Sequence, residues 1–151
     1  MIKENIKQLF VRDLQKLKLE IEAYEDESLI WQISRGINNS AGNLCLHIVG
    51  NLNTYIGSIL GNTGYIRNRD QEFSLKNIPK ATLVEEINNV ITIIEDSFHS
   101  LTDDQLAENY PDEVLGSTMS TRQFLIHLIG HLNYHLGQIN YHRRILTGIK
   151  G

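Results

Sequence analysis

The apolar positions of this chain recur every three or four residues in four long stretches, which is the spacing of one buried face on a helix. The first stretch, residues 2–23, carries its apolar side chains among Lys, Arg, Glu and Gln. The second covers residues 41–60, the third begins at Thr82 and ends near Ser100, and the last covers residues 121–146. With little strand signal between them, these stretches predict an all-α four-helix bundle.

Residues that favour helix starts precede the later stretches. Ser40 or its neighbour Asn39 is the expected N-cap of the second helix, since both side chains can accept from the first free backbone N–H groups. Thr82 and Ser120 are each followed three residues later by Glu or Gln, which predicts a capping box at both positions. Between the second and third helices, residues 62–80 form a long connection, and such connections often carry function or cross the end of a bundle.

Composition and charge narrow the class of protein. The 151 residues, with 41% hydrophobic and 21% charged, predict one globular domain over residues 1–151. A formal charge of -4 without a basic patch argues against binding to nucleic acid. No apolar run approaches the ~18 residues of a membrane span, and the first residues have no signal-peptide pattern, so we expect a cytoplasmic protein that binds no membrane.

Three smaller features are expected to be structural. The single cysteine, Cys45, excludes an internal disulfide and a Cys-rich zinc site, and its Leu-rich surroundings predict a buried thiol. The close pairs Arg67/Arg69 and Arg143/Arg144 are expected on solvated surface.

Candidate chemistry is concentrated on the last predicted helix. At 100° per residue, His127, His131, His135, Gln138 and His142 fall within ~40° of one line along it, where a bundle helix would usually carry Leu. His131 and His135 are four residues apart, so two imidazoles stand on one face and can bind one transition metal. No Glu follows the first His, which excludes the H-E-x-x-H metalloprotease pattern. The alternative is that these histidines are hydrogen-bonded core residues.

A third ligand would have to come from elsewhere. His47 lies on a small polar strip beside the apolar face of the second predicted helix, a suitable place for a metal ligand in a bundle core. Spacing alone does not select it.

Two segments carry a resemblance to a known family. Residues 130–139, with His-x-x-x-His followed by Gly137-Gln138, resemble the C-terminal signature of the DinB/YfiT-like metalloenzymes, which are bacterial four-helix bundles. Residues 39–48 are similar to the family's motif around the second-helix His, and the similarity in helix order covers roughly residues 2–147. The resemblance implies that His47, His131 and His135 bind a divalent metal, usually zinc or nickel, with one position left open.

The resemblance also implies a function. Some family members are transferases that use a low-molecular-weight thiol such as bacillithiol, mycothiol or glutathione, so a thiol S-transferase-like enzyme acting on a small electrophilic substrate is the first hypothesis. Relatives often pair, which predicts a homodimer through the apolar flanks of the last helix. In this scheme His127 lies in the second shell or bonds within the core, Gln138 orients a ligand and His142 lies at the pocket rim.

Two other functions stay open at this point. One is a non-catalytic, metal-binding or stress-related bundle, which predicts a closed site with a fourth ligand such as His127. The other is a metal-dependent hydrolase, which would need a general base that the histidine stripe does not supply.

Overall fold

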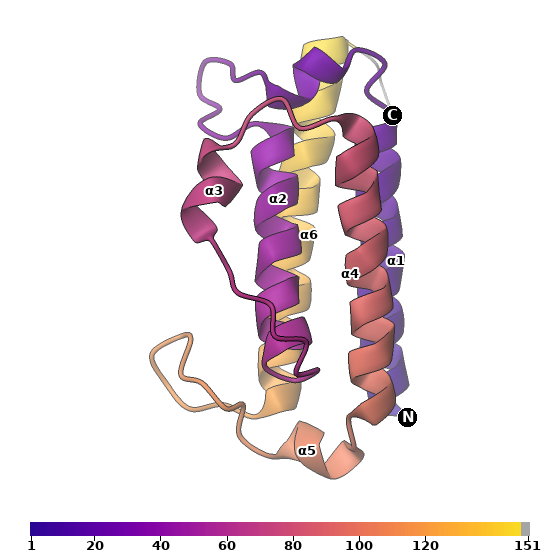
Figure 1. Ribbon diagram of the computed structural model, residues 1–151, viewed down its shortest axis with the longest axis vertical. Helices are drawn as coiled ribbons and strands as arrows, with labels where there is room; N and C mark the ends of the chain where they lie inside the picture. The colour runs from indigo at the N-terminus through magenta and orange to yellow at the C-terminus, as the bar shows by residue number, and fades with distance from the viewer. Residues whose placement is uncertain (149–151) are drawn as a thin grey trace.

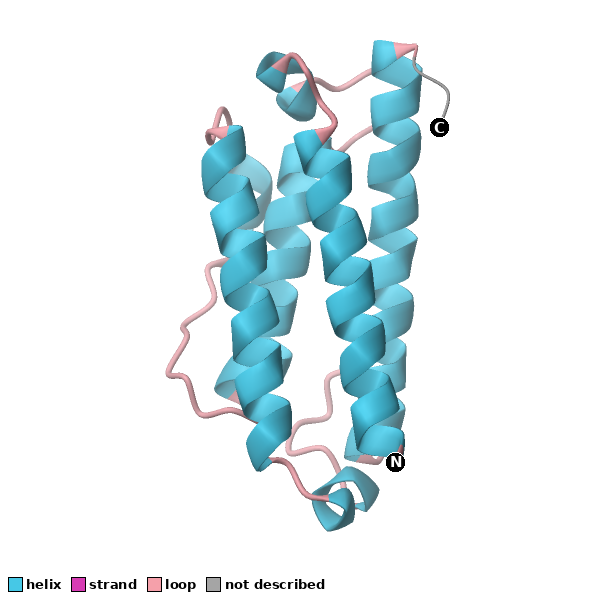
Figure 2. Ribbon diagram, turned by 90° about the vertical axis from the view of Figure 1, so that its right-hand side faces the viewer, coloured by secondary structure: helices cyan, strands magenta, loops and turns pink. Residues whose placement is uncertain are grey.

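Four long helices form the body of the molecule, described here by a computed structural model over residues 1–148 (Figure 1). They are α1 (Ile2–Glu22), α2 (Ala41–Leu52), α4 (Lys80–Ser100) and α6 (Thr121–Thr147). Figure 2 shows them aligned along one axis, with helices and loops and no strand drawn among the described residues. The predicted all-α four-helix bundle is confirmed.

The chain direction differs from a simple up-and-down bundle. In Figure 1, α1 and α6 run upward, whereas α2 and α4 both run downward. A connection along the outside of α2 therefore returns the chain to the end where α4 begins, and it contains the short helix α3 (Arg69–Ser74) (Figure 1). The long connection expected over residues 62–80 is thus a crossover, and it packs α3 directly against α2.

Shorter elements close the two ends of the bundle. A 3-10 turn, η1 (Glu27–Trp31), follows α1, and α5 (Asp103–Ala107) joins α4 to the loop before α6. Trp31 of η1 packs on Gly42, where an added Cβ would lie 2.7 Å from the indole ring. A side chain at this position would therefore push η1 away from the start of α2.

Two of the predicted helix starts are confirmed and one is wrong. The hydroxyls of Ser40 and Ser120 accept from the backbone N–H three residues ahead. The third start is misplaced, because α4 begins at Lys80 after Pro79, and Thr82 lies inside its first turn. The first N–H of α4 is satisfied by a distant side chain instead, since Lys80 N donates to Glu27 Oε2 over 3.1 Å.

The second helix is less regular than its sequence pattern predicts. The α-helix ends at Leu52 and continues as a π-helical segment, η2 (Asn53–Ser58). Within it the Thr54 hydroxyl donates to the Gly50 carbonyl over 2.8 Å, and Tyr110 Oη donates to the Tyr55 carbonyl over 2.7 Å. Both bonds occupy carbonyls where the helical ladder changes register, and periodicity alone gives no sign of this change.

The core is continuous and apolar, with buried side chains from all four long helices. Cys45 belongs to it, and burial raises the pKa of its thiol to about 12, so the predicted buried thiol is confirmed. Within residues 1–148, no helix is both long and apolar enough to cross a membrane.

Two polar contacts, seven residues apart on each helix, fix α1 against α6. Asn133 donates to the fully buried Asp13 carboxylate over 2.7 Å, and Asn140 donates to Glu20 over 2.7 Å. Arg143 also donates to Glu20 over 2.7 Å and is only 6% exposed, so its expected position on solvated surface is wrong. Equal spacing on both helices requires that they run in parallel, and a shift by one residue would break both contacts.

Replacement of Asn133 by Ala tests this register. The change leaves the buried Asp13 carboxylate without one of its donors, and we expect the free energy of unfolding to fall by about 1–3 kcal/mol. Urea denaturation measures the loss. Asn89→Ala, an exposed position on α4, is the matched control and should change stability by less than about 0.5 kcal/mol. Equal stability of the two variants would contradict a stabilising role for the Asp13 contact.

Candidate metal centre

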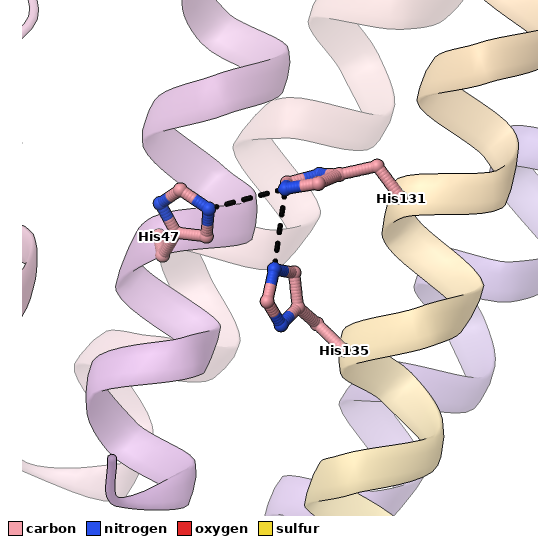
Figure 3. Close-up of side chains that lie close together, drawn as sticks. All are labelled: His47, His131 and His135. Atoms are coloured by element: carbon pink, nitrogen blue, oxygen red, sulfur yellow. Dashed lines mark hydrogen bonds between the residues drawn. The ribbon is translucent and has the colours of Figure 1, made fainter. Parts of the chain in front are cut away.

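Three imidazoles meet between α2 and α6. His131 and His135 stand one turn apart on α6, and His47 projects from α2 toward them (Figure 3). The Nε2 atom of His131 lies 3.2 Å from Nε2 of His47 and 3.2 Å from Nε2 of His135. One ring nitrogen from each residue lies within 4.8 Å of the other two, so this group could bind a divalent metal ion.

The outer nitrogens of two rings have fixed partners. His47 Nδ1 lies 3.0 Å from Glu72 Oε1, and His135 Nδ1 lies 2.7 Å from Gln138 Oε1. Carboxylate and amide oxygens only accept, so each Nδ1 carries the hydrogen and donates it. A neutral imidazole has one N–H, and Nε2 of both His47 and His135 is therefore an unprotonated acceptor turned toward His131.

With all three rings neutral, no placement of hydrogens turns both 3.2 Å contacts into hydrogen bonds. Neutral His131 can donate from Nε2 to one neighbour only, so at least one of the two 3.2 Å contacts joins two lone pairs. A metal ion is a shared partner for three lone pairs, and neutral imidazole is its commonest protein ligand. The donor set therefore fits a divalent transition metal.

The surroundings keep the rings of His131 and His135 uncharged. Burial, helped by the charges of His135 and His47, lowers the pKa of His131 from 6.5 to about 4. Burial also lowers the pKa of His135, against the opposing effect of its hydrogen bond to Gln138. Neutral rings at physiological pH are the form that binds a metal, because protonation removes the lone pair.

Glu72 is the residue of this site that sequence analysis missed. It lies in α3, is 5% exposed, and accepts from Arg67 at both oxygens, each over 2.8 Å. Burial alone would raise the pKa of the Glu72 carboxyl, but hydrogen bonds from His47 and Arg67 outweigh it and lower the pKa. Arg67 was expected on solvated surface, and this is wrong, because it forms a half-buried ion pair.

Steric room for Glu72 comes from one glycine of α2. An added Cβ on Gly50 would lie 2.0 Å from Glu72 Oε2, so no larger residue fits while the carboxylate is in place. Glu72 sits in a connection without helical periodicity, twenty-five positions from His47. The nearest signal in the sequence is the polar strip of α2, which contains His47 and Gly50.

The remaining predicted residues occupy different surroundings. Gln138 contacts His135, as described above. His127 is exposed and stacks on Phe124 at 5.9 Å between ring centroids, so its expected role as a core hydrogen bonder is wrong. It is not part of the three-histidine group. His142 is 2% exposed, with Tyr24 Oη 2.6 Å from Nδ1 and the Gln32 carbonyl 2.7 Å from Nε2.

The contacts of His142 make it a core residue rather than a simple rim residue. Since a carbonyl only accepts, Nε2 carries the hydrogen and Nδ1 accepts from Tyr24. This chain of hydrogen bonds joins the end of α1, the segment after η1, and α6. Burial lowers the pKa of His142, so the ring stays neutral.

A cleft of about 340 Å³ is lined in part by Gln138, the residue that contacts His135. Its walls are formed by the loop over residues 36–39, by Leu44 of α2 and by the C-terminal turns of α6. Gln138 lies in the wall, so the cleft is one side chain away from His135. His142 also contributes to the wall, and no charged side chain does.

The fold and the site together define an all-helical bundle with a three-histidine group able to bind a divalent metal. Residues 2–150 match the family described as "Protein of unknown function (DUF1572)", and the chain belongs to this family. The crystal structure of a DinB-like protein from Bacillus cereus ATCC 10987 superimposes with a TM-score of 0.72 at 24% sequence identity. That match covers 97% of this chain and 93% of the other. The predicted DinB-like fold is therefore confirmed. No curated protein matches the chain.

Buried neutral histidines make the metal-free protein sensitive to acid. The pKa values of His131, His135 and His142 are lowered in the folded state, so the unfolded chain binds more protons below about pH 6.5. Stability should therefore be complete above pH 6.5 and fall as the pH drops toward about 4. Urea denaturation of chelator-treated protein between pH 7 and 5 measures this fall.

His131→Ala should reduce the slope of stability against pH. His99→Ala, at an exposed position on α4, should leave it unchanged. An identical slope in wild type and His131→Ala would contradict a neutral buried His131.

Proposed function

We propose that this protein is a metal-dependent enzyme of thiol S-transferase-like chemistry, with His47, His131 and His135 as the metal ligands. The observation that supports it most strongly is the convergence of three Nε2 atoms. Two of them, in His47 and His135, carry no hydrogen because Nδ1 is the donor in each ring. Three protein ligands leave a coordination position open, as catalytic rather than structural zinc sites do.

Each part of the proposed site has a defined task. A zinc or nickel ion bound there would lower the pKa of a thiol and hold the thiolate for attack on an electrophile. Gln138 orients His135 through the Nδ1 hydrogen bond, and the lowered pKa of His131 keeps its lone pair available at neutral pH. Cys45 is buried with a raised pKa, so the reacting sulfur comes from a bound low-molecular-weight thiol and not from the protein.

The cleft beside Gln138 is the proposed binding place of a small-molecule substrate. The lining combines Asn38, Asn39 and Gln138, which carry amide groups, with apolar residues that include Leu44 and Tyr141. A lining without charged side chains favours an uncharged molecule that combines hydrogen-bonding and apolar parts.

A metal-dependent hydrolase is the second candidate, because the carboxylate of Glu72 lies close to the three histidines. Glu72 lies beside His47, although the histidine stripe of α6 has none. Both of its oxygens already accept hydrogen bonds from Arg67, and one of them also from His47. A general base needs a free lone pair near the attacking water, so this arrangement favours the transferase. A non-catalytic bundle would be favoured by a fourth protein ligand, and exposed His127 lies outside the group.

Metal content tests the proposal directly. Untagged wild-type protein should take up about one equivalent of zinc or nickel, measured by inductively coupled plasma mass spectrometry after equilibration with a buffered excess. His47→Ala and His131→Ala should lose it, because two imidazoles do not hold a divalent ion against a chelating buffer. His127→Ala is the matched control and should retain the metal.

Thiol transfer to a chromogenic electrophile is then measured with the loaded protein. Activity that falls at least about 100-fold in His131→Ala and persists in His127→Ala supports the enzyme. Metal uptake without activity toward any of several thiols would favour the non-catalytic bundle, and no uptake would overturn the metal site itself.

We also propose that the protein forms a homodimer through the outer face of α6. Four large side chains along this face are between 55% and 65% exposed: Ile126, Tyr134, Tyr141 and Ile145. Gly130 and Gly137 lie between them, with no atom within 4 Å of an added Cβ, so a second helix could approach closely. The expected interface is revised, because Leu128, Leu132, Leu136 and Ile139 are buried inside the bundle.

Light scattering tests the dimer. At micromolar concentration the wild type should give a mass of about 35 kDa, twice the 17.3 kDa of one chain. Tyr134→Glu places a charge in the proposed contact and should shift the mass to that of one chain. Glu85→Gln, on α4, is a control that should leave the mass unchanged. A wild-type mass of one chain would overturn the proposal.

A further inference from the structure

We propose that Glu72 and Arg67 are positioning residues that set the ring orientation and the protonated nitrogen of His47 for metal binding. This inference rests on the proposed metal site, and it adds two residues of the crossover to a site otherwise built from α2 and α6. It assigns them a role in metal affinity and none in bond making.

The hydrogen bond from His47 to Glu72 determines which nitrogen faces the other histidines. The Nδ1 hydrogen is donated to Glu72 Oε1 over 3.0 Å, which leaves the Nε2 lone pair 3.2 Å from His131. With the opposite tautomer, Nε2 would carry the hydrogen and could not bind a metal. Partners of this kind on metal-binding histidines typically change metal affinity by ~10–100-fold.

Arg67 determines how Glu72 is presented. Its Nε and Nη2 atoms donate to the two carboxylate oxygens, each over 2.8 Å, which fixes the plane of the carboxylate. Arg67 Nη2 also lies 3.4 Å from His47 Nδ1. Both of these nitrogens carry hydrogen, so this contact is not a hydrogen bond. Arg67 therefore orients the Glu72 carboxylate as an acceptor for His47, and its positive charge balances the negative charge of that carboxylate.

The crossover is built to hold this acceptor in place. The Asn43 amide of α2 donates to the backbone carbonyls of Glu72 and Leu75, each over 2.9 Å. The ring of Phe73 packs on the His47 ring, with centroids 5.0 Å apart. Gly50 supplies the space that the carboxylate occupies. Contacts at and after Glu72 thus converge on one short stretch of α2.

A purely structural ion pair is the alternative interpretation. Arg67 and Glu72 could fix the crossover to α2 without any effect on the metal. The two roles differ in what they change: a structural pair alters stability alone, whereas a positioning pair alters the His47 tautomer and the zinc affinity at equal stability.

The experiment measures zinc dissociation constants by competition with a chromophoric chelator at pH 7.5, for Glu72→Ala, Glu72→Gln and Arg67→Met. Asp70→Asn, at an exposed position on the same short helix, is the control for charge. Ile94→Val is the control for stability, since it removes a buried methyl group from α4, which carries none of the three histidines. Urea denaturation of each metal-free variant accompanies the measurement.

The expected result is a graded loss of affinity at a constant stoichiometry of one zinc. Glu72→Ala should weaken zinc binding by about 10–100-fold, and Glu72→Gln by less, because the amide oxygen is still an acceptor. The zinc affinity of Arg67→Met should lie between that of the Glu72 variants and that of wild type. The affinities of both controls should stay within about twofold of wild type. Unchanged affinity in Glu72→Ala and Glu72→Gln would overturn the inference, as would an equal loss in Ile94→Val.

A second measurement does not depend on the metal. Nitrogen-15 chemical shifts of the imidazoles in metal-free wild type should show His47 with hydrogen on Nδ1, and Glu72→Ala, which removes the acceptor, should shift this population toward the other tautomer. The inference fails if wild-type His47 carries its hydrogen on Nε2. If wild type binds no metal but has the expected tautomer, the proposed function fails while the positioning by Glu72 stands.

Discussion

The structure depends on the antiparallel packing of α2 on α6, because it places one imidazole of α2 opposite two of α6. The Nε2 atom of His131 then lies 3.2 Å from Nε2 of His47 and 3.2 Å from Nε2 of His135, which leaves no room for a water molecule between them. In His47 and His135 the hydrogen sits on Nδ1, where it is donated to Glu72 and Gln138. Neither Nε2 therefore has a hydrogen to donate to His131. These converging lone pairs form a donor set that could hold a divalent metal ion.

The rest of the bundle holds these two helices in register. Asp13 and Glu20 of α1 contact Asn133 and Asn140 of α6 at equal spacing, which fixes α6 along the bundle axis. The crossover holds α2 in place, since Asn43 and His47 of α2 both form hydrogen bonds to Glu72 of α3. A bundle with alternating directions and short loops would have no segment on this outer face of α2. The crossover topology and the outer partner of His47 are therefore linked.

Much of this architecture follows from the sequence. Apolar periodicity predicts the four long helices within a few residues, and the serine caps at α2 and α6 follow from local hydrogen bonding. The His131/His135 pair follows from helical geometry alone. His47 is different, because periodicity places it beside the core without showing which helix it faces. Its assignment needed the resemblance to a known family.

The features that sequence reasoning missed depend on contacts between distant segments. The start of α4 is set by Pro79 and by a side chain of η1, so the local Thr-x-x-Glu pattern gave the wrong residue. Glu72 lies in a connection without periodicity, and its importance depends on Gly50 and His47 of another helix. A sequence pattern reports which face of a helix is buried, and it does not report which loop will cover a polar strip.

The position of Glu72 also bears on the kind of chemistry the site can support. A carboxylate beside a metal ligand serves either as a base or as an acceptor that orients the ligand, and the two roles need different surroundings. A base needs an unoccupied lone pair on the substrate side. Here Arg67 and His47 donate to the carboxylate, and Gln138 rather than Glu72 lines the cleft. This arrangement supports the proposed thiol transfer over hydrolysis, because a metal-bound thiol needs less help from a base than a metal-bound water does.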